Sequence, residues 1–176
     1  NPLHELKNYG QRVWYDNLNR EMLVSGKLQK MVDEDGVTGG TSNPSIFEKA
    51  IASGTAYDDH MRELIARDAS IPDIFDGLTV ADVQQSADIF RRAYDQSKGA
   101  DGYASLEVPP DLAYNTDATI GNARRLFRAL DRPNVMIKIP GTQEGLPAVE
   151  TCLSEGININ ITLLFGAENY EQVALA

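Results

Sequence analysis

The residue of this sequence best suited to covalent chemistry is Lys138, which stands inside the apolar run Val135–Pro140. Pro133-Asn134 precedes the run and Pro140-Gly141 closes it, which is typical of a short strand buried on both faces. Burying an ammonium group costs free energy, and desolvation favours the neutral, nucleophilic amine that a Schiff-base mechanism requires. The alternative is a structural lysine whose aliphatic stem follows the strand while its ammonium group reaches water.

Further polar side chains stand at the ends of the neighbouring predicted strands. In chain order they are Asp16, Thr41, Ser42, Asn43, Glu107, Asn160 and Thr162. One lysine, two carboxylates and several neutral hydrogen-bonding groups suit carbonyl chemistry through an imine. The lysine would bond to the carbonyl carbon, and the carboxylates together with water would move protons.

Several of these residues also have a structural interpretation. The pair Asp16-Asn17 is a favourable N-cap for the helix that follows, and Asn43-Pro44 fits an N-cap with proline in the first turn. Glu107 could be an ordinary solvated charge at a strand end. Its apolar neighbours indicate partial burial, however, which would favour the protonated form and a role in proton transfer. Thr162 is otherwise a common strand residue.

The elements that must position these residues alternate between strands and helices. The expected strands cover residues 13–16, 37–42, 103–108, 135–139 and 157–165. Expected helices cover residues 3–9, 18–35, 116–130 and 143–154, and two others begin near residues 44 and 168. Two capping-box patterns, Thr55-x-x-Asp58 and Thr79-x-x-Asp82, each predict the start of a further helix. This alternation predicts right-handed βαβ units and a parallel sheet.

About five such units are present, against the eight of a closed (β/α)₈ barrel. The chain starts at Asn1 without a methionine and stops at Ala176 within a helical pattern. Ending there would leave residues 157–164 as a long apolar edge strand, which native proteins avoid. We therefore expect an α/β fold, with residues 1–176 forming the incomplete N-terminal part of one (β/α)₈ TIM barrel. The competing fold is a doubly wound sheet, which no glycine-rich nucleotide motif supports.

Composition narrows the class of function. The 176 residues include 16 basic and 26 acidic side chains, a formal net charge of −10, which argues against nucleic acid or an anionic membrane as partner. No apolar run approaches a membrane span, and no signal peptide is visible. The single Cys152 allows no internal disulfide, which fits a cytoplasmic location. His4 and His60 have no neighbouring Cys or His, so we expect no metal centre and no histidine triad.

Two stretches of the sequence resemble the signatures of the transaldolase family. Residues 39–47 (GGTSNPSIF) resemble its first signature, and residues 135–146 (VMIKIPGTQEGL) resemble the second, which contains the Schiff-base lysine. Residues 105–108 (SLEV) and 160–165 (NITLLF) match the family in order and spacing. The resemblance covers essentially the whole chain, and these motifs together, on successive strands, are highly specific.

The resemblance implies a (β/α)₈ enzyme that transfers a dihydroxyacetone unit between sugar phosphates in the pentose phosphate pathway, without a cofactor. The donor would be sedoheptulose 7-phosphate or fructose 6-phosphate, and the acceptor glyceraldehyde 3-phosphate or erythrose 4-phosphate. Residues 13–18 and 33–36 are similar to the longer bacterial branch of the family, some members of which are fused to a phosphoglucose isomerase domain.

The same resemblance implies four catalytic residues. Lys138 would attack the ketose carbonyl and form the imine. Glu107, with a water molecule also held by Thr162, would relay protons while the carbinolamine loses water. Asp16 would take the proton from the hydroxyl group whose oxygen becomes the released aldehyde, so that the carbon–carbon bond breaks.

Substrate binding would fall to Asn43 and Asn160, which would hydrogen-bond the retained three-carbon unit, with Thr41 and Ser42 at the same site. The family's phosphate-binding serine and arginines come from strands later than Ala176. We therefore expect this polypeptide alone to be inactive or nearly so. Function would belong to the full-length chain or to a complex with the remaining C-terminal segment of the same barrel.

Two other functions stay open from the sequence. A fructose-6-phosphate-type aldolase of the same superfamily would release dihydroxyacetone instead of transferring it. Glu107 favours the transaldolase, because the small aldolases of that superfamily lack a carboxylate there. A non-catalytic half-barrel would act as an interaction module, which only the unfinished edge at residues 157–164 supports. Homo-oligomerisation is open in each case.

Overall fold

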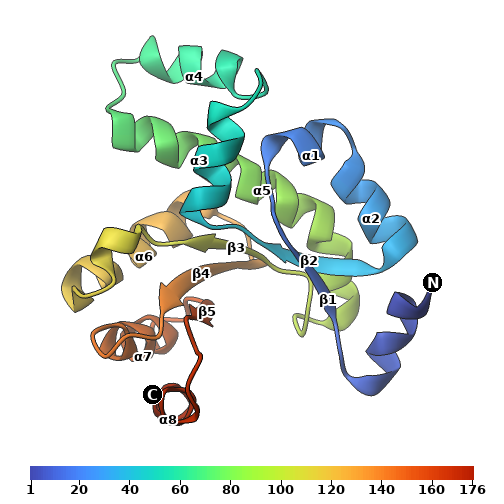
Figure 1. Cartoon of the computed structure of the whole chain (residues 1–176), viewed down its shortest axis with the longest axis vertical. Coiled ribbons are helices and arrows are strands. Elements are labelled where there is room, and N and C mark those ends of the chain that lie inside the picture. Colours follow the sequence, from blue (N-terminus) through green and yellow to red (C-terminus); the bar gives the residue numbers. More distant parts are fainter.

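Five parallel strands, placed side by side in chain order, form one sheet that curls through part of a barrel (Figure 1). The computed structural model describes residues 1–176. The strands are β1 (Val13–Asp16), β2 (Val37–Thr41), β3 (Ala104–Glu107), β4 (Val135–Pro140) and β5 (Ile159–Thr162). Every pairing between neighbours is parallel. This is the partial (β/α)₈ barrel that the alternation of elements predicted.

The helices lie around the outside of the curled sheet (Figure 1). They are α1 (Arg20–Val24), α2 (Lys27–Asp35), α3 (Pro44–Ala52), α4 (Asp58–Ile65), α5 (Ile71–Ser97), α6 (Thr116–Leu130), α7 (Gly145–Ser154) and α8 (Ala167–Leu175), with the 3₁₀ helices η1 (Pro2–Tyr9) and η2 (Pro110–Leu112). The helices between β1 and β5 form the crossovers that parallel strands require, whereas η1 precedes β1 and α8 follows β5. None of them combines the length and apolar character needed to cross a membrane.

The main hydrophobic core lies between the sheet and these helices. Val135, Ile137 and Ile139 of β4 are completely buried, and they belong to one apolar cluster with Leu126 and Leu130 of α6. Because side chains alternate along a strand, the residues between them face the opposite, concave side of the sheet. The same strand therefore contributes to the core with one face and to the inside of the barrel with the other.

Two glycines of β2 allow the β1 region to pack closely against its neighbour. A Cβ atom at Gly39 would lie 2.5 Å from Cε2 of the Trp14 ring, and one at Gly40 would lie 2.8 Å from Cδ2 of Leu18. Both distances are well inside the ~3.5–4.0 Å separation of packed carbon atoms. The Gly39-Gly40 pair therefore lets Trp14 and Leu18 rest directly on the strand backbone.

The structure corrects two of the predicted helices. The helix expected over residues 18–35 is divided into α1 and α2, because Gly26 takes the left-handed conformation, with φ of 72°, between them. The Thr79-x-x-Asp82 pattern lies inside α5 and starts no helix. The N-cap of α5 is Ser70, whose hydroxyl oxygen accepts the Asp73 backbone N–H at 3.4 Å.

Smaller corrections concern three other segments. The expected first helix is a 3₁₀ helix. The N-cap position of α4 is Tyr57, which makes no side-chain cap bond, so Thr55 lies just outside the helix. Strand β5 is shorter than the predicted 157–165, because Leu163 takes φ of 62° and ends the extended backbone. The remaining elements agree with the predicted bounds to within two residues.

Cys152 on α7 provides a test of how the helices pack against the sheet. Its side chain is fully buried, and burial raises the pKa of the thiol, which suppresses the reactive thiolate. We expect DTNB to modify Cys152 in the native protein at least ~100-fold more slowly than in the urea-unfolded protein. The absorbance of the released thiol reports both rates. Equal rates would show that the Cys152 side chain on α7 is not buried in the native protein.

Candidate active site

The strand register places the predicted site residues on one face of the sheet. Asp16 pairs with Thr41 across β1 and β2, Glu107 pairs with Lys138 across β3 and β4, and Lys138 pairs with Asn160 of β5. Residues paired in register point to the same side of a sheet. All five therefore lie on the concave face, toward the C-terminal ends of the strands, where barrel enzymes carry their reacting groups.

Lys138 is held within this face by two contacts. Its Nζ atom donates to the main-chain oxygen of Ser42 at 2.9 Å and lies 3.2 Å from Oε2 of Glu107. Only 9% of the Lys138 side chain is exposed, so its ammonium group does not extend into bulk water. The interpretation of Lys138 as a strand-end lysine reaching solvent is therefore wrong. A carbonyl dipole and a carboxylate compensate part of the cost of its desolvation.

Glu107 is partly buried, as its apolar neighbours predicted, with 19% of its side chain exposed. Its carboxylate stands next to the Lys138 amine at a distance suited to direct proton transfer. The two side chains reach each other because they occupy paired positions on adjacent strands. This arrangement can supply and remove protons at a nitrogen that reacts with a carbonyl group.

Asp16 stands at the exposed end of β1 and accepts a hydrogen bond from the Thr41 hydroxyl. It does not cap the following helix. Asn19 is the N-cap of α1, and its side chain accepts the Met22 backbone N–H at 3.2 Å. The interpretation of Asp16-Asn17 as an N-cap is therefore wrong, and the Asp16 carboxylate is oriented by β2 instead.

The predicted binding residues Asn43, Ser42 and Asn160 each make a hydrogen bond within the protein. Asn43 is the N-cap of α3, with its Oδ1 accepting the Ile46 backbone N–H at 2.9 Å, as expected. Ser42 is buried, and its hydroxyl donates to the Ser105 carbonyl at 3.2 Å. Asn160 donates from Nδ2 to the Ser105 hydroxyl oxygen at 3.2 Å. The Asn43 side chain therefore uses its oxygen for the cap and not its amide nitrogen, whereas the Ser42 hydroxyl joins the end of β2 to β3.

Ser105 is a member of this site that the sequence reasoning missed. It joins β2 and β5 through the two hydrogen bonds just described, and it lies on β3 two residues before Glu107. Because strand side chains alternate, a polar residue two positions from Glu107 must share its face. That period-two signal could have identified Ser105 from the sequence.

Thr162, at the end of β5, contributes a buried hydroxyl oxygen that has no hydrogen-bond partner within the protein. Buried hydroxyl groups in proteins are usually hydrogen-bonded to protein or to ordered water. Thr162 follows Asn160 by two residues in β5 and therefore lies on the same face of the sheet. Its hydroxyl group can therefore bind a water molecule or a ligand on the concave side.

A cavity of about 730 Å³ adjoins this group of residues on the side of β1. Asp16 and Asn17 line it from the β1–α1 turn, Lys49 from α3, and Tyr57 from the turn before α4. The cavity therefore extends from the Asp16 carboxylate outward between the turn after β1 and helix α3.

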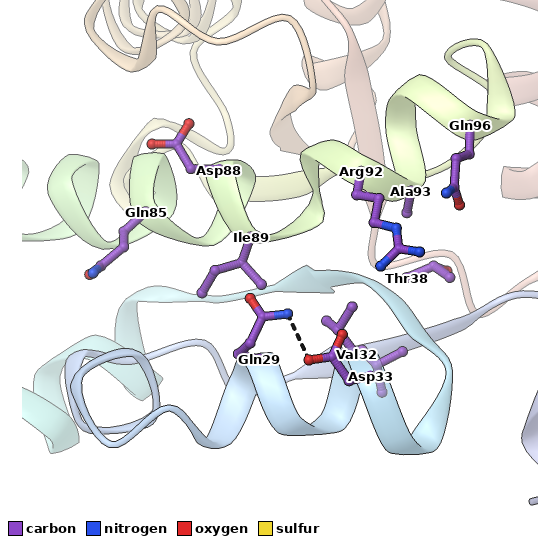
Figure 2. A pocket seen from close by; sticks show the side chains of 11 residues that line it. Gln29, Val32, Asp33, Thr38, Gln85, Asp88, Ile89, Arg92, Ala93 and Gln96 are labelled. Carbon is purple, nitrogen blue, oxygen red and sulfur yellow. Dashed lines mark hydrogen bonds between the residues drawn. The ribbon is translucent and has the colours of Figure 1, made fainter.

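A second groove, of about 660 Å³, lies between α2 and α5 and contains none of the predicted residues (Figure 2). Ile89 and Arg92 line it from α5, opposite Gln29 and Asp33 of α2, where Gln29 Nε2 donates to an Asp33 carboxylate oxygen at 3.1 Å (Figure 2). The groove lies between two helices outside the sheet, so it is separate from the concave face that carries Lys138.

The arginines of α6 form ion pairs on the outside of the molecule. Arg125 pairs with Asp76 of α5 at 2.7 Å, and Arg124 pairs with Glu155 after α7. Both guanidinium groups are substantially exposed. These contacts place both arginines in ion pairs on the exposed side of α6.

Comparison with known proteins adds an independent finding. A family model described as Transaldolase/Fructose-6-phosphate aldolase matches residues 13–176. The chain is 49% identical over its whole length to Transaldolase 2 of Nostoc punctiforme and 48% identical to the transaldolase of Trichodesmium erythraeum. It is also 45% identical, over 98% of its length, to the transaldolase of Frankia alni. It spans 46–47% of the length of these relatives. These matches confirm the resemblance seen in the motifs.

The contact between Lys138 and Glu107 should appear as an energetic coupling. In a double-mutant cycle with Lys138→Met and Glu107→Gln, we expect a coupling of about 1–3 kcal/mol in the free energy of unfolding, measured in urea. Desolvation makes the interaction stronger than a surface pair and leaves either partner uncompensated when the other is removed.

The exposed pair Arg62–Asp59 of α4 serves as the matched control for this cycle. Water screens that pair, so its coupling from Arg62→Met and Asp59→Asn should stay below about 1 kcal/mol. A coupling between Lys138 and Glu107 no larger than the control value would contradict the described contact.

Proposed function

Because this chain belongs to the transaldolase/fructose-6-phosphate aldolase family, we propose that it provides the nucleophile and proton-transfer groups of a Schiff-base transaldolase. The observation that carries the proposal is the placement of the Lys138 amine 3.2 Å from the Glu107 carboxylate on the concave face of the sheet. A nucleophile beside an acid–base group is what imine formation needs.

The proposed reaction transfers a dihydroxyacetone unit from sedoheptulose 7-phosphate or fructose 6-phosphate to glyceraldehyde 3-phosphate or erythrose 4-phosphate. The neutral Lys138 amine attacks the ketose carbonyl carbon, and the resulting carbinolamine loses water to give the imine. Cleavage of the adjacent carbon–carbon bond releases an aldehyde and leaves an enamine on the lysine. The enamine attacks the acceptor aldehyde, and water then hydrolyses the new imine and frees Lys138.

We assign the proton transfers in the first half of this reaction to Glu107. Its carboxylate lies beside the nitrogen that loses protons as the carbon–nitrogen bond forms. We assign to it the proton that leaves with the carbinolamine hydroxyl, passed through a water molecule. Thr162 would help to hold this water, because its buried hydroxyl oxygen makes no hydrogen bond within the protein.

We assign the proton transfer of the bond-breaking step to Asp16. Its carboxylate is exposed at the end of β1, oriented by the Thr41 hydroxyl, and borders the adjoining cavity. It would accept the proton of the substrate hydroxyl group as the carbon–carbon bond breaks, and would return that proton when the acceptor adds.

Asn43 and Asn160 would hydrogen-bond the three-carbon unit that remains on Lys138. Asn160 pairs with Lys138 in the register of β4 and β5, and Asn43 directly follows Ser42, whose carbonyl accepts from Lys138. Thr41 would act through Asp16. Hydrogen bonds from the two amides would keep the enamine in place until an acceptor arrives.

We assign the complete activity to the full-length protein, within the pentose phosphate pathway of the cytoplasm. The substrate phosphate would be held by residues of the strands that complete the barrel. Residues 1–176 alone would then carry the reacting groups without the anchor, and their transfer activity would be slight.

Borohydride trapping on the full-length protein tests the proposal. With fructose 6-phosphate, reduction of the imine should add a stable mass to the peptide that contains Lys138, as read by mass spectrometry. Lys138→Ala should abolish the adduct, because no amine replaces it at the site, whereas the exposed Lys30→Ala should keep it. Glu107→Gln should slow adduct formation by ~10²–10⁴-fold.

Two results would change the assignment. Absence of an adduct on Lys138 in the unaltered full-length protein would exclude the Schiff-base enzyme and leave the interaction module. An adduct accompanied by free dihydroxyacetone, accumulating without acceptor, would identify an aldolase of the same superfamily instead of a transaldolase.

A further inference from the structure

Directly after the turn that follows Asp16, the chain enters a buried polar cluster of Arg20, Tyr57 and Asp82. The three residues come from separate elements, since Arg20 begins α1, Tyr57 precedes α4 and Asp82 lies in the middle of α5. The Asp82 side chain is completely buried, and only 13% of the Arg20 side chain is exposed. Burying this much charge is costly, and the reaction described above uses none of it.

The contacts of the cluster converge on Arg20. Its Nε pairs with one Asp82 carboxylate oxygen, and its Nη2 donates to the Leu78 carbonyl at 3.3 Å and lies 3.4 Å from His60 Nδ1. The Tyr57 hydroxyl donates to the other Asp82 oxygen at 2.7 Å and accepts the Arg20 backbone N–H at 3.0 Å. The guanidinium also lies 4.9 Å from the centre of the Tyr57 ring.

The Tyr57 hydroxyl therefore connects the main chain of Arg20 to the carboxylate that binds its side chain. Burial raises the pKa of the Tyr57 phenol, so the group stays protonated and remains a donor at neutral pH. Burial also raises the pKa of Asp82, while its hydrogen bonds with Arg20 and Tyr57 act in the opposite direction. Arg20 is consequently fixed in both its backbone and its side chain.

The turn between this cluster and Asp16 is short and held at each residue. The Leu18 backbone N–H donates to the Thr41 carbonyl at 3.2 Å, and the Leu18 side chain is fully buried. Asn19 caps α1 and donates from Nδ2 to the Asn17 carbonyl at 3.1 Å. One end of the turn is thus attached to β2 and the other to the cluster, with Asp16 at its start.

We propose that Arg20, Tyr57 and Asp82 are positioning residues that hold the Asp16 carboxylate in place for carbon–carbon bond cleavage. The inference rests on the proposed function, which assigns proton transfer at that step to Asp16. Small displacements of a reacting group can cost ~10²-fold in rate. Imine formation should be independent of the cluster, because the contacts that hold Lys138 come from Glu107 and the Ser42 carbonyl.

The test is Tyr57→Phe in the full-length protein, which keeps the ring but removes the bridging hydroxyl. In single turnovers with fructose 6-phosphate, we expect the rate of borohydride-trappable adduct formation on Lys138 to stay within about 2-fold. The subsequent release of glyceraldehyde 3-phosphate should slow by roughly 10-fold, as expected for a misplaced catalytic group. The trapped fraction should therefore rise during turnover.

Two comparisons make this result specific. Tyr103→Phe removes another hydrogen-bonded tyrosine hydroxyl, which donates to the Gly99 carbonyl at 2.7 Å, and should change neither step. In an Asp16→Asn background, Tyr57→Phe should cause little further loss, because the group it positions has already lost its function. Arg20→Lys, which retains the charge but not the forked geometry, should reproduce the loss confined to cleavage.

Several outcomes would overturn the inference. Equal slowing of adduct formation and cleavage would indicate a general structural role, as would a full 10-fold loss in the Asp16→Asn background. If Tyr57→Phe does not fold, the step affected by Arg20→Lys decides between the same alternatives. Absence of any Lys138 adduct in the unaltered protein would instead reject the proposed function, and the inference with it.

Discussion

The interaction on which this half-barrel depends is the contact of the buried Lys138 ammonium with the Glu107 carboxylate and the Ser42 carbonyl. A lysine inside a parallel sheet is tolerated only if other groups replace its lost hydration. Here the replacement comes from two neighbouring parts of the chain, β3 and the end of β2. The position of the amine is therefore set by the pairing of strands more than by the local conformation of β4.

The same pairing separates the two layers of the molecule. Along β4, Ile137 and Ile139 enter the core beneath the helices, and Lys138 between them faces the concave side. A shift of register by one residue would exchange the two faces and place the lysine among leucines. The apolar core and the polar face therefore stabilise one another's register, and the glycines of β2 add to this by allowing Trp14 and Leu18 to pack on the sheet.

Much of this arrangement could be predicted from the sequence, because strand ends and family motifs are local patterns. The positions of Lys138, Glu107 and Asp16 followed from them, and the fold class followed from the alternation of elements. A short pattern that occurs both at helix starts and inside helices gave a wrong prediction. Thr79-x-x-Asp82 has the spacing of a capping box but lies within α5. Contacts between distant segments left no local signal at all. The Tyr57 and Asp82 partners of Arg20 lie 37 and 62 residues away, and only the folded chain reveals that they meet.

The order of the strands also bears on how the protein is made. Each strand pairs with the one synthesised immediately before it, so every ladder can form as soon as its second strand has left the ribosome. Chains emerge at about 5–20 residues per second, and N-terminal regions commonly fold first. The longest delay falls between β2 and β3, while α3, α4 and α5 are being translated. During that interval β1 and β2 are present together, but Lys138 and Glu107 have not yet been synthesised. The concave face that carries these two residues is therefore completed after the first two strands.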